Sequence, residues 1–175
     1  MGQRHILHFD CNCFYASVEM QEHPELRRKS IAVCGDPEAR HGIVLTASYP
    51  AKRMGVKTGM PIWEAKQHCR DLIIVPASYG KYQKYSGYVR EVFNDYTDQV
   101  ESFGLDEAWL DITGSVGLFG SPVKIAKEIS VRIKRELGIT VSIGVSFNKI
   151  TAKLGSDYKK PEGITIIEPE NYKEI

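Results

Sequence analysis

The sequence of 175 residues has little of several features that would narrow its function. It contains only four cysteines, Cys11, Cys13, Cys34 and Cys69, which are too few and too scattered for a disulfide framework. Cys11 and Cys13, taken together with the adjacent His68 and Cys69, match no familiar spacing of zinc ligands. Reduced, structural cysteines are therefore the better interpretation, and they suit a reducing compartment.

Long hydrophobic runs and a net charge are also missing. No apolar stretch approaches the roughly 20 residues of a membrane-spanning helix, and the opening MGQRHILHFD lacks the apolar segment of a signal peptide. We therefore expect a cytoplasmic protein with no membrane partner. A net charge of +1 does not identify a nucleic-acid partner, because such binding depends on a local basic face. A hydrophobic content of 42% is enough for a core in one or two domains.

The hydrophobic pattern predicts alternating strands and helices. Strands are expected at 5–9, 30–35, 43–48, 72–77, 99–104, 108–113 and 140–147. Helices are expected from Asn12 to just before Pro24, around 49–55 and 61–69, over 79–96, from Pro122 to Leu137, and after Asn148. The tyrosines of the helix over 79–96 are interpreted as packing residues. In the helix after Asn148 we expect Ile150 and Leu154 to face inward.

The stretch SFGLDEAWLDIT, residues 102–113, places Asp106 beside Glu107 within an apolar segment. On a regular strand adjacent side chains point to opposite faces, so one carboxylate would face the core. The flanking segments are rich in strand-forming residues, which predicts a hairpin with the acidic pair at its tip.

Without the segment 11–78, the order of elements is that of an α+β, ferredoxin-like (βαββαβ) fold. In that fold the end of the first strand, Asp10, lies next to the start of the third, Glu107. Three carboxylates brought together repel one another unless a cation is present, and oxygen ligands favour Mg²⁺ or Mn²⁺ for two-metal phosphoryl or nucleotidyl transfer. Alternatively, Asp106 and Glu107 are polar turn residues and Asp10 is a helix cap. The spacing alone supports the two interpretations about equally.

Four motifs resemble those of the Y-family translesion DNA polymerases, in particular the DinB-like group. They are HFDCNCFYASVE, TASYPAKRMGVKTGMP, GLDEAWLDIT and SFNKITAKLGSDYKKPEGI, in the family's order and spacing over almost the whole chain. The resemblance implies a ferredoxin-like polymerase palm with an inserted small α/β fingers domain. It places the catalytic palm at 1–11 and 78–167, the fingers at 12–77, and the start of a truncated thumb at 168–175, where Tyr172 and Ile175 would open a helix.

The resemblance also assigns roles to individual residues. Asp10, Asp106 and Glu107 would be catalytic and bind metal, together with the backbone carbonyl of Cys11. Tyr15 would be the steric gate that excludes a 2′-hydroxyl. The nucleotide would be held by these residues: Cys13, Phe14 and Tyr15 through backbone amides, and Thr46, Tyr49, Lys52 and Lys160 through side chains. Lys52 stands where many relatives have arginine, and Gly104 where a serine is common.

The function implied is template-directed DNA synthesis, in which two Mg²⁺ ions, or Mn²⁺, assist transfer of a nucleotide from dNTP to a primer 3′-hydroxyl. Primer–template DNA and dNTP are the expected partners, and contacts with a sliding clamp would come from segments beyond this chain. The chain alone is expected to be weakly active or inactive. Two alternatives are a nucleotidyl cyclase with a similar palm, which would need neither Tyr15 nor the fingers, and a non-catalytic DNA-binding scaffold, which would have no need to keep all three carboxylates.

Overall fold

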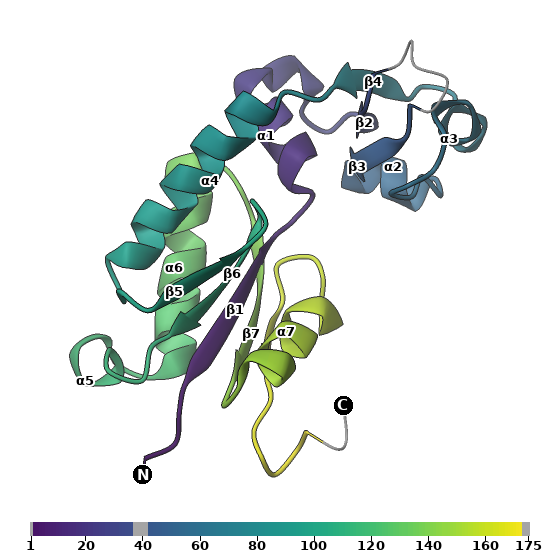
Figure 1. Ribbon diagram of the computed structural model, residues 1–175. Coiled ribbons are helices and arrows are strands. Elements are labelled where there is room, and N and C mark those ends of the chain that lie inside the picture. Colours follow the sequence, from purple (N-terminus) through teal and green to yellow (C-terminus); the bar gives the residue numbers. More distant parts are fainter. Residues whose placement is uncertain (1, 37–41, 173–175) are drawn as a thin grey trace. The chain divides into compact units, whose positions relative to one another are not determined.

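A computed structural model describes residues 2–36 and 42–172, and the chain divides into two compact units (Figure 1). The first unit comprises the chain up to Asn12 and from Lys84 onward, and the second comprises Cys13–Gln83. The second unit is thus inserted directly after the first strand of the first. Most of the segment 36–42, between the strands expected at 30–35 and 43–48, lies outside the described residues.

The first unit is built on a five-stranded sheet in the order β5-β6-β1-β7-β8. The strands are β1 (Ile6–Cys11), β5 (Val100–Phe103), β6 (Glu107–Asp111), β7 (Val141–Ser146) and β8 (Ile164–Ile166). All neighbours pair antiparallel except β7 and β8, which pair parallel. Without β8, the elements follow the expected ferredoxin-like order. The sequence analysis did not predict β8, a strand of only three residues directly after Gly163.

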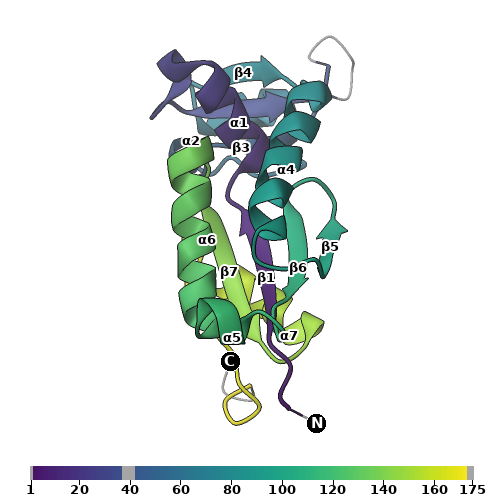
Figure 2. The ribbon, with the colours of Figure 1, turned by 90° about the vertical axis from the view of Figure 1, so that its left-hand side faces the viewer.

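Helices cover both faces of this sheet. They are α4 (Tyr79–Asn94, whose first residues belong to the second unit), α5 (Val116–Phe119), α6 (Pro122–Leu137) and α7 (Lys149–Tyr158). Figure 2 shows α6 and the first-unit part of α4 on one face, with α7 on the other. Side chains cap α6 and α7, because Ser121 Oγ accepts a hydrogen bond from the amide of Lys124 and Asn148 Oδ1 accepts one from that of Thr151.

The orientation expected for α7 is wrong. Ile150 and Leu154 are 82% and 48% exposed, whereas Ala152 and Gly155 are buried. A helix with small residues on its inner face can approach a sheet closely. In α7 these small residues pack against the sheet, and the large side chains point to solvent. The positions of the large hydrophobic residues therefore do not predict the buried face of this helix.

The second unit has a three-stranded sheet in the order β3-β2-β4. Its elements are α1 (Phe14–Glu22), a 3₁₀ turn η1 (Pro24–Leu26), β2 (Ile31–Cys34), β3 (Val44–Ala47), α2 (Tyr49–Arg53), α3 (Ile62–His68) and β4 (Ile73–Pro76). Small side chains fill its core, among them Ala32, Val44 and Ala51. The four cysteines are unpaired, as predicted, and Cys34 and Cys69 belong to this core.

Two further observations concern the chain as a whole. None of its helices, within the described ranges, is long and apolar enough to cross a membrane. The helix expected from Tyr172 onward is not seen as far as Tyr172, where residues 169–172 form turns, and Ile175 lies outside the described residues.

Candidate active site

The middle of the sheet brings the end of β1 against the start of β6. The register pairs Asp10 of β1 with Glu107 of β6, while Ser142 of β7 lies opposite Asp10 on the other side. The predicted juxtaposition of the first strand's end with the third strand's start is confirmed. Asp10 is buried, with 8% of the residue exposed, so its charge interacts strongly with its neighbours.

A tight turn between β5 and β6 places Asp106 beside this pair. Gly104 has a positive φ of 69°, which glycine adopts without strain. The amide of Cys11 donates to the carbonyl of Asp106 over 2.9 Å and ties the turn to the end of β1. Asp106 therefore belongs to the turn and Glu107 to the strand, so strict strand alternation does not apply to the pair.

The electrostatics confirm that the carboxylates lie close together. Burial, and then the charge of Asp10, raise the pKa of Asp106 to about 6, with a smaller contribution from Glu107. Burial, followed by the charges of Asp106, Asp10 and Glu107, also raises the pKa of the Cys11 thiol. The thiol therefore stays protonated and is a poor ligand, which leaves the Cys11 backbone as the group suited to binding a cation.

Two lysines contact two of these carboxylates. Lys153 of α7 donates to Glu107 Oε2, and Lys160, after α7, donates to Asp10 Oδ2 over 2.5 Å. Lys160 also contacts Asp157 over 2.9 Å. Burial on its own would lower the pKa of Lys160, but its hydrogen bonds with Asp10 and Asp157 raise it. Lys160 therefore remains charged at neutral pH.

His8 lies beneath this group and is fully buried. Its Nε2 is 3.1 Å from Glu107 Oε2 but forms no hydrogen bond with it. Burial first, and then the charge of Lys153, lower the pKa of His8 to about 4, so the imidazole is neutral at neutral pH. The contact between His8 and Glu107 is therefore not an ion pair.

The donor set suits a hard divalent cation. Asp10, Asp106 and Glu107 offer only oxygen ligands, which favour magnesium or manganese over zinc. The raised pKa of Asp106 indicates a concentration of negative charge that a cation would relieve. With Asp10 and Glu107 each paired to a lysine, no three His, Cys, Asp or Glu side chains within residues 2–36 and 42–172 are arranged to hold a metal ion. The chemistry fits such an ion, and binding it would require the lysine pairs to rearrange.

In the second unit, the residues predicted to contact phosphate and sugar lie at the start of α1. Cys13, the residue before the helix, adopts a left-handed conformation, and α1 begins at Phe14. The N–H groups of a helix's first turn point out of the helix toward a potential anion. Phe14 is buried, as expected. The ring of Tyr15 stacks on that of Tyr82, with centroids 4.2 Å apart and planes 11° apart.

The remaining predicted nucleotide contacts in this unit lie on β3 and α2. Thr46 is on β3, and α2 begins three residues later with Tyr49. Lys52, one helical turn after Tyr49, places its Nζ 5.2 Å from the centre of the Tyr49 ring. The structure therefore brings the aromatic and cationic members of this group together on one helix face.

Sequence reasoning missed three residues that shape these sites: His8, Lys153 and Tyr82. A signal was available for His8, because residues two apart on a strand share a face and His8 precedes Asp10 by two. No comparable signal existed for Lys153, since its contact with Glu107 depends on where α7 lies over the sheet. Tyr82 was assigned to packing, which is correct, but its stacking with Tyr15 was not foreseen.

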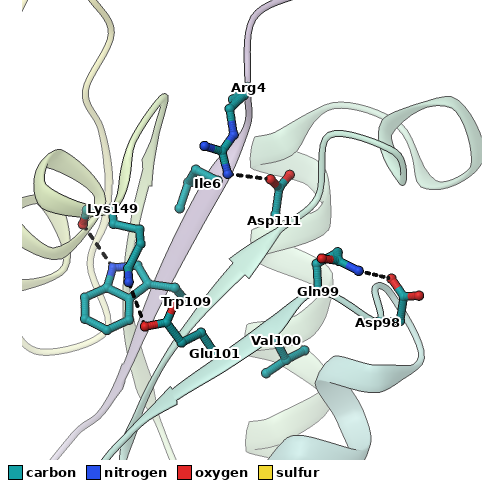
Figure 3. Close-up of a pocket in the computed structure, with 9 residues that line it drawn as sticks. All are labelled: Arg4, Ile6, Asp98, Gln99, Val100, Glu101, Trp109, Asp111 and Lys149. Carbon is teal, nitrogen blue, oxygen red and sulfur yellow. Dashed lines mark hydrogen bonds and ion pairs between the residues drawn. The ribbon is translucent and has the colours of Figure 1, made fainter.

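A separate pocket of about 250 Å³ lies on the first unit (Figure 3). Two ion pairs cross its lining, one from Arg4 to Asp111 and one from Lys149 to Glu101, with 2.9 and 2.7 Å between their charged atoms. The lining contains none of the predicted site residues. Asp111 and Glu101 have these basic partners, and Asp98 accepts a hydrogen bond from the Gln99 amide over 3.1 Å, so the pocket resembles a structural polar surface rather than a second reaction centre.

The fold and the carboxylate group together define a class of protein. A ferredoxin-like sheet with carboxylates where its central strand meets an adjacent hairpin is the arrangement expected of a nucleotidyl-transferring palm. The model of the impB/mucB/samB family matches residues 9–157, and the chain belongs to that family.

Individual relatives agree with this assignment. The chain is 58% identical to a DNA polymerase IV of Acetivibrio thermocellus over 98% of its own length and 43% of the relative's. It is 44% identical to a DNA polymerase IV of Ralstonia nicotianae, covering 95% of the chain and 46% of the relative. The chain thus spans about half the length of the curated relatives it matches.

Solved structures of Y-family polymerases share the fold. An insertion ternary complex of Dbh DNA polymerase aligns with a TM-score of 0.90 and 35% identity, over 97% of this chain and 50% of that one. DinB from Sulfolobus solfataricus aligns with a TM-score of 0.89 and 34% identity, again over 97% of this chain and 50% of that one. The expected family and the mixed α+β fold are confirmed. Dependence on a divalent metal is general in such a family.

Proposed function

We propose that this chain is the catalytic palm, with the associated fingers, of a translesion-type DNA-directed DNA polymerase. The observation that carries the proposal is the pairing of Asp10 with Glu107, with Asp106 in the turn beside them, in a chain of this family. The palm would comprise 1–11 and 78–167, the fingers 12–77, and the beginning of a thumb 168–175. Primer–template DNA and dNTP are the proposed substrates, in the cytoplasm.

In the proposed reaction the primer 3′-oxygen forms a bond to the α-phosphorus of the dNTP. The bond from that phosphorus to the bridging oxygen of the β-phosphate breaks, pyrophosphate leaves, and the hydroxyl proton passes to solvent. Two Mg²⁺ ions, when bound, would activate the attacking oxygen and stabilise the leaving group. Asp10 and Asp106 would hold both ions, Glu107 would lie nearest the primer terminus, and the Cys11 carbonyl would add a ligand.

The other proposed contacts orient the nucleotide. The amides of Cys13, Phe14 and Tyr15 at the start of α1 would receive phosphate oxygens. Thr46, Tyr49, Lys52 and Lys160 would hold the triphosphate. A lysine is a point charge without the two-pronged geometry of arginine, so Lys52 would bind phosphate with less directionality than the arginine of many relatives.

The experiment is primer extension with Mg²⁺ on the full-length protein. Template-dependent extension that disappears in Asp106→Asn is the expected result. Extension without a template, or a cyclic nucleotide as product, would instead favour a cyclase. Unchanged extension in a folded Asp106→Asn variant would overturn the assignment of the carboxylates.

A further inference from the structure

Two side chains lie against the same carboxylate oxygen of Glu107. Lys153 donates to Oε2, and His8 Nε2 lies 3.1 Å from that oxygen. On its other side, His8 Nδ1 is 2.7 Å from Ser156 Oγ, whose hydroxyl donates to the carbonyl of Lys153 over 2.8 Å. Because that hydroxyl has only one proton, Nδ1 must be the hydrogen-bond donor to Ser156. The Nε2 of His8 therefore faces Glu107 with a lone pair.

A lone pair and a carboxylate oxygen at this distance repel each other. The ammonium of Lys153 offsets the repulsion, because it contacts the same oxygen and lies at the edge of the buried region, with its side chain 35% exposed against 19% for Glu107. An ion pair of partly buried groups is screened less than one at the surface. Lys153 thus stabilises Glu107 in its present position above His8.

Lys153 also has a second partner beside Glu107. Its Nζ lies 5.3 Å from the centre of the Phe103 ring, and that ring is 52% exposed. A lysine that leaves Glu107 can therefore keep a cation–π contact while its charge moves into solvent. Keeping the Phe103 contact makes exchange of the ammonium for another cation less costly than release into water alone.

We propose that Lys153 is a displaceable counter-ion of the carboxylate site, meaning a built-in cation that holds Glu107 until a divalent ion replaces it. The inference rests on the proposed function, because it requires that Asp10, Asp106 and Glu107 bind metal. It goes beyond that function by giving a positioning role to a residue outside the predicted site. Lys153 keeps the carboxylates assembled without metal and lowers their apparent affinity for it.

Metal affinity tests the first half of the proposal. Binding of Mn²⁺ to this chain is measured by electron paramagnetic resonance of the free ion, with circular dichroism to confirm folding. Lys153→Met should bind Mn²⁺ about three- to tenfold more tightly, since the ion no longer competes with an ion pair of about 0.6 to 1.4 kcal/mol. Lys153→Arg, which retains the pair, should remain close to the unsubstituted chain.

Lys149 provides the matched control. It lies one turn earlier on α7, and it pairs with Glu101 instead of a carboxylate of the site (Figure 3). Lys149→Met removes the same charge from the same helix, and should change Mn²⁺ affinity by less than twofold. If Lys149→Met and Lys153→Met raised Mn²⁺ affinity equally, the effect would come from the loss of one positive charge and not from the contact with Glu107, which overturns the proposal.

Displacement of Lys153 from Glu107 is measured on the unsubstituted chain, so this test does not require any variant to fold. The rate of Lys153 acetylation by acetic anhydride, followed by mass spectrometry, should rise when Mn²⁺ is added, while that of Lys149 stays constant. An unchanged Lys153 rate at saturating Mn²⁺ rejects the counter-ion role.

The two possible failures are distinguishable through Asp106→Asn. Mn²⁺ binding that does not depend on Asp106, or no binding at all, rejects the metal site and with it the proposed function and this inference. Binding that depends on Asp106, together with no effect at Lys153 in affinity or acetylation, rejects the counter-ion role alone.

Discussion

At the scale of single residues, Asp106 carries an electrostatic cost that arises when the chain folds. Its pKa is raised from 3.8 to about 6 by burial and by Asp10. Between these two values the folded chain binds more protons than the unfolded one, so the free energy of unfolding falls as pH rises. The penalty is therefore complete above about pH 6 and disappears as pH falls toward 4.

We predict that Asp106→Asn stabilises the metal-free chain at pH 8 and has little effect at pH 4.5. A shift of about two units corresponds to about 3 kcal/mol, and solvent screening of this half-buried group reduces the expected gain to about 1 kcal/mol. Urea denaturation in EDTA at both pH values measures it. Asp98→Asn, at an exposed carboxylate of the same unit, is the control. A gain that is equal at both pH values would contradict the electrostatic cause.

Tyr15 gives the second prediction at this scale. Its ring is fixed against Tyr82, and the Tyr82 hydroxyl in turn donates to the buried Glu19 over 2.7 Å. A ring held in this way can discriminate against a 2′-hydroxyl by a clash. In the full-length protein, Tyr15→Ala should gain ribonucleotide incorporation relative to deoxynucleotide by about a hundredfold, or about 3 kcal/mol.

Single-nucleotide incorporation kinetics with paired ribo- and deoxynucleotides measure this ratio. If Tyr15 were only a packing residue, its truncation would depress both reactions together through a loss of about 3 to 5 kcal/mol of stability. Tyr88→Ala, at a more exposed tyrosine of α4, should leave the ratio unchanged. An unchanged ratio in Tyr15→Ala would reject the steric gate.

The residue scale also shows what sequence could and could not predict. Asp10, Asp106 and Glu107 were predictable as a group, because strand order and a tight turn determine their meeting. Lys153 was not, because it reaches Glu107 from an element whose orientation depends on packing. The same dependence explains the error at Ile150, which is exposed because α7 packs through small residues instead.

At the scale of elements, the close approach of α7 to β7 determines where Lys153 lies. A Cβ added to Gly144 of β7 would lie 1.7 Å from the carbonyl oxygen of Ala152 in α7. No side-chain rotation relieves a clash with backbone, so the helix would have to move away from the sheet. The glycine on β7 is thus a requirement of this helix position.

We therefore predict that Gly144→Ala destabilises the chain by about 3 kcal/mol or more, in the range of severe overpacking. Gly117→Ala is the matched control, because a Cβ there meets no atom within 4 Å. Urea denaturation followed by circular dichroism compares the two. Similar stability of both variants would mean that α7 tolerates displacement, and that its contact with β7 does not fix Lys153.

Strand register was the most predictable property at this scale. β6 alternates half-buried and buried residues, which sets its register, and Gly104 with its positive φ fixes the hairpin from β5 to β6. The short β8 was not predictable, because three residues carry too little periodicity to distinguish a strand from a loop.

At the scale of the whole molecule, the chain contains two compact units and little excess charge. Its runs of adjacent basic residues are these: Arg27, Arg28 and Lys29; Lys52 and Arg53; Lys134 and Arg135; and Lys159 and Lys160. Lys160 already pairs with Asp10 and Asp157, so it contributes less to an external phosphate. Duplex affinity depends mainly on the number of phosphates neutralised, and few contacts give weak binding that is lost as salt rises.

We predict that the chain alone binds a primer–template duplex with a Kd weaker than about 10 μM at 150 mM salt, typical of non-specific binding. Fluorescence anisotropy over a salt series measures both the affinity and its slope. Replacing exposed Lys159 by Gln should reduce the slope of log K against log salt by about one if it contacts a phosphate, and by nothing if it does not.

Extension of the primer by this chain should be slow or undetectable, because a site that cannot retain its duplex rarely presents the 3′-hydroxyl to the carboxylates. Submicromolar binding at this salt concentration would show that the palm and fingers suffice to grip DNA, and the weak activity expected of the chain would then need another cause.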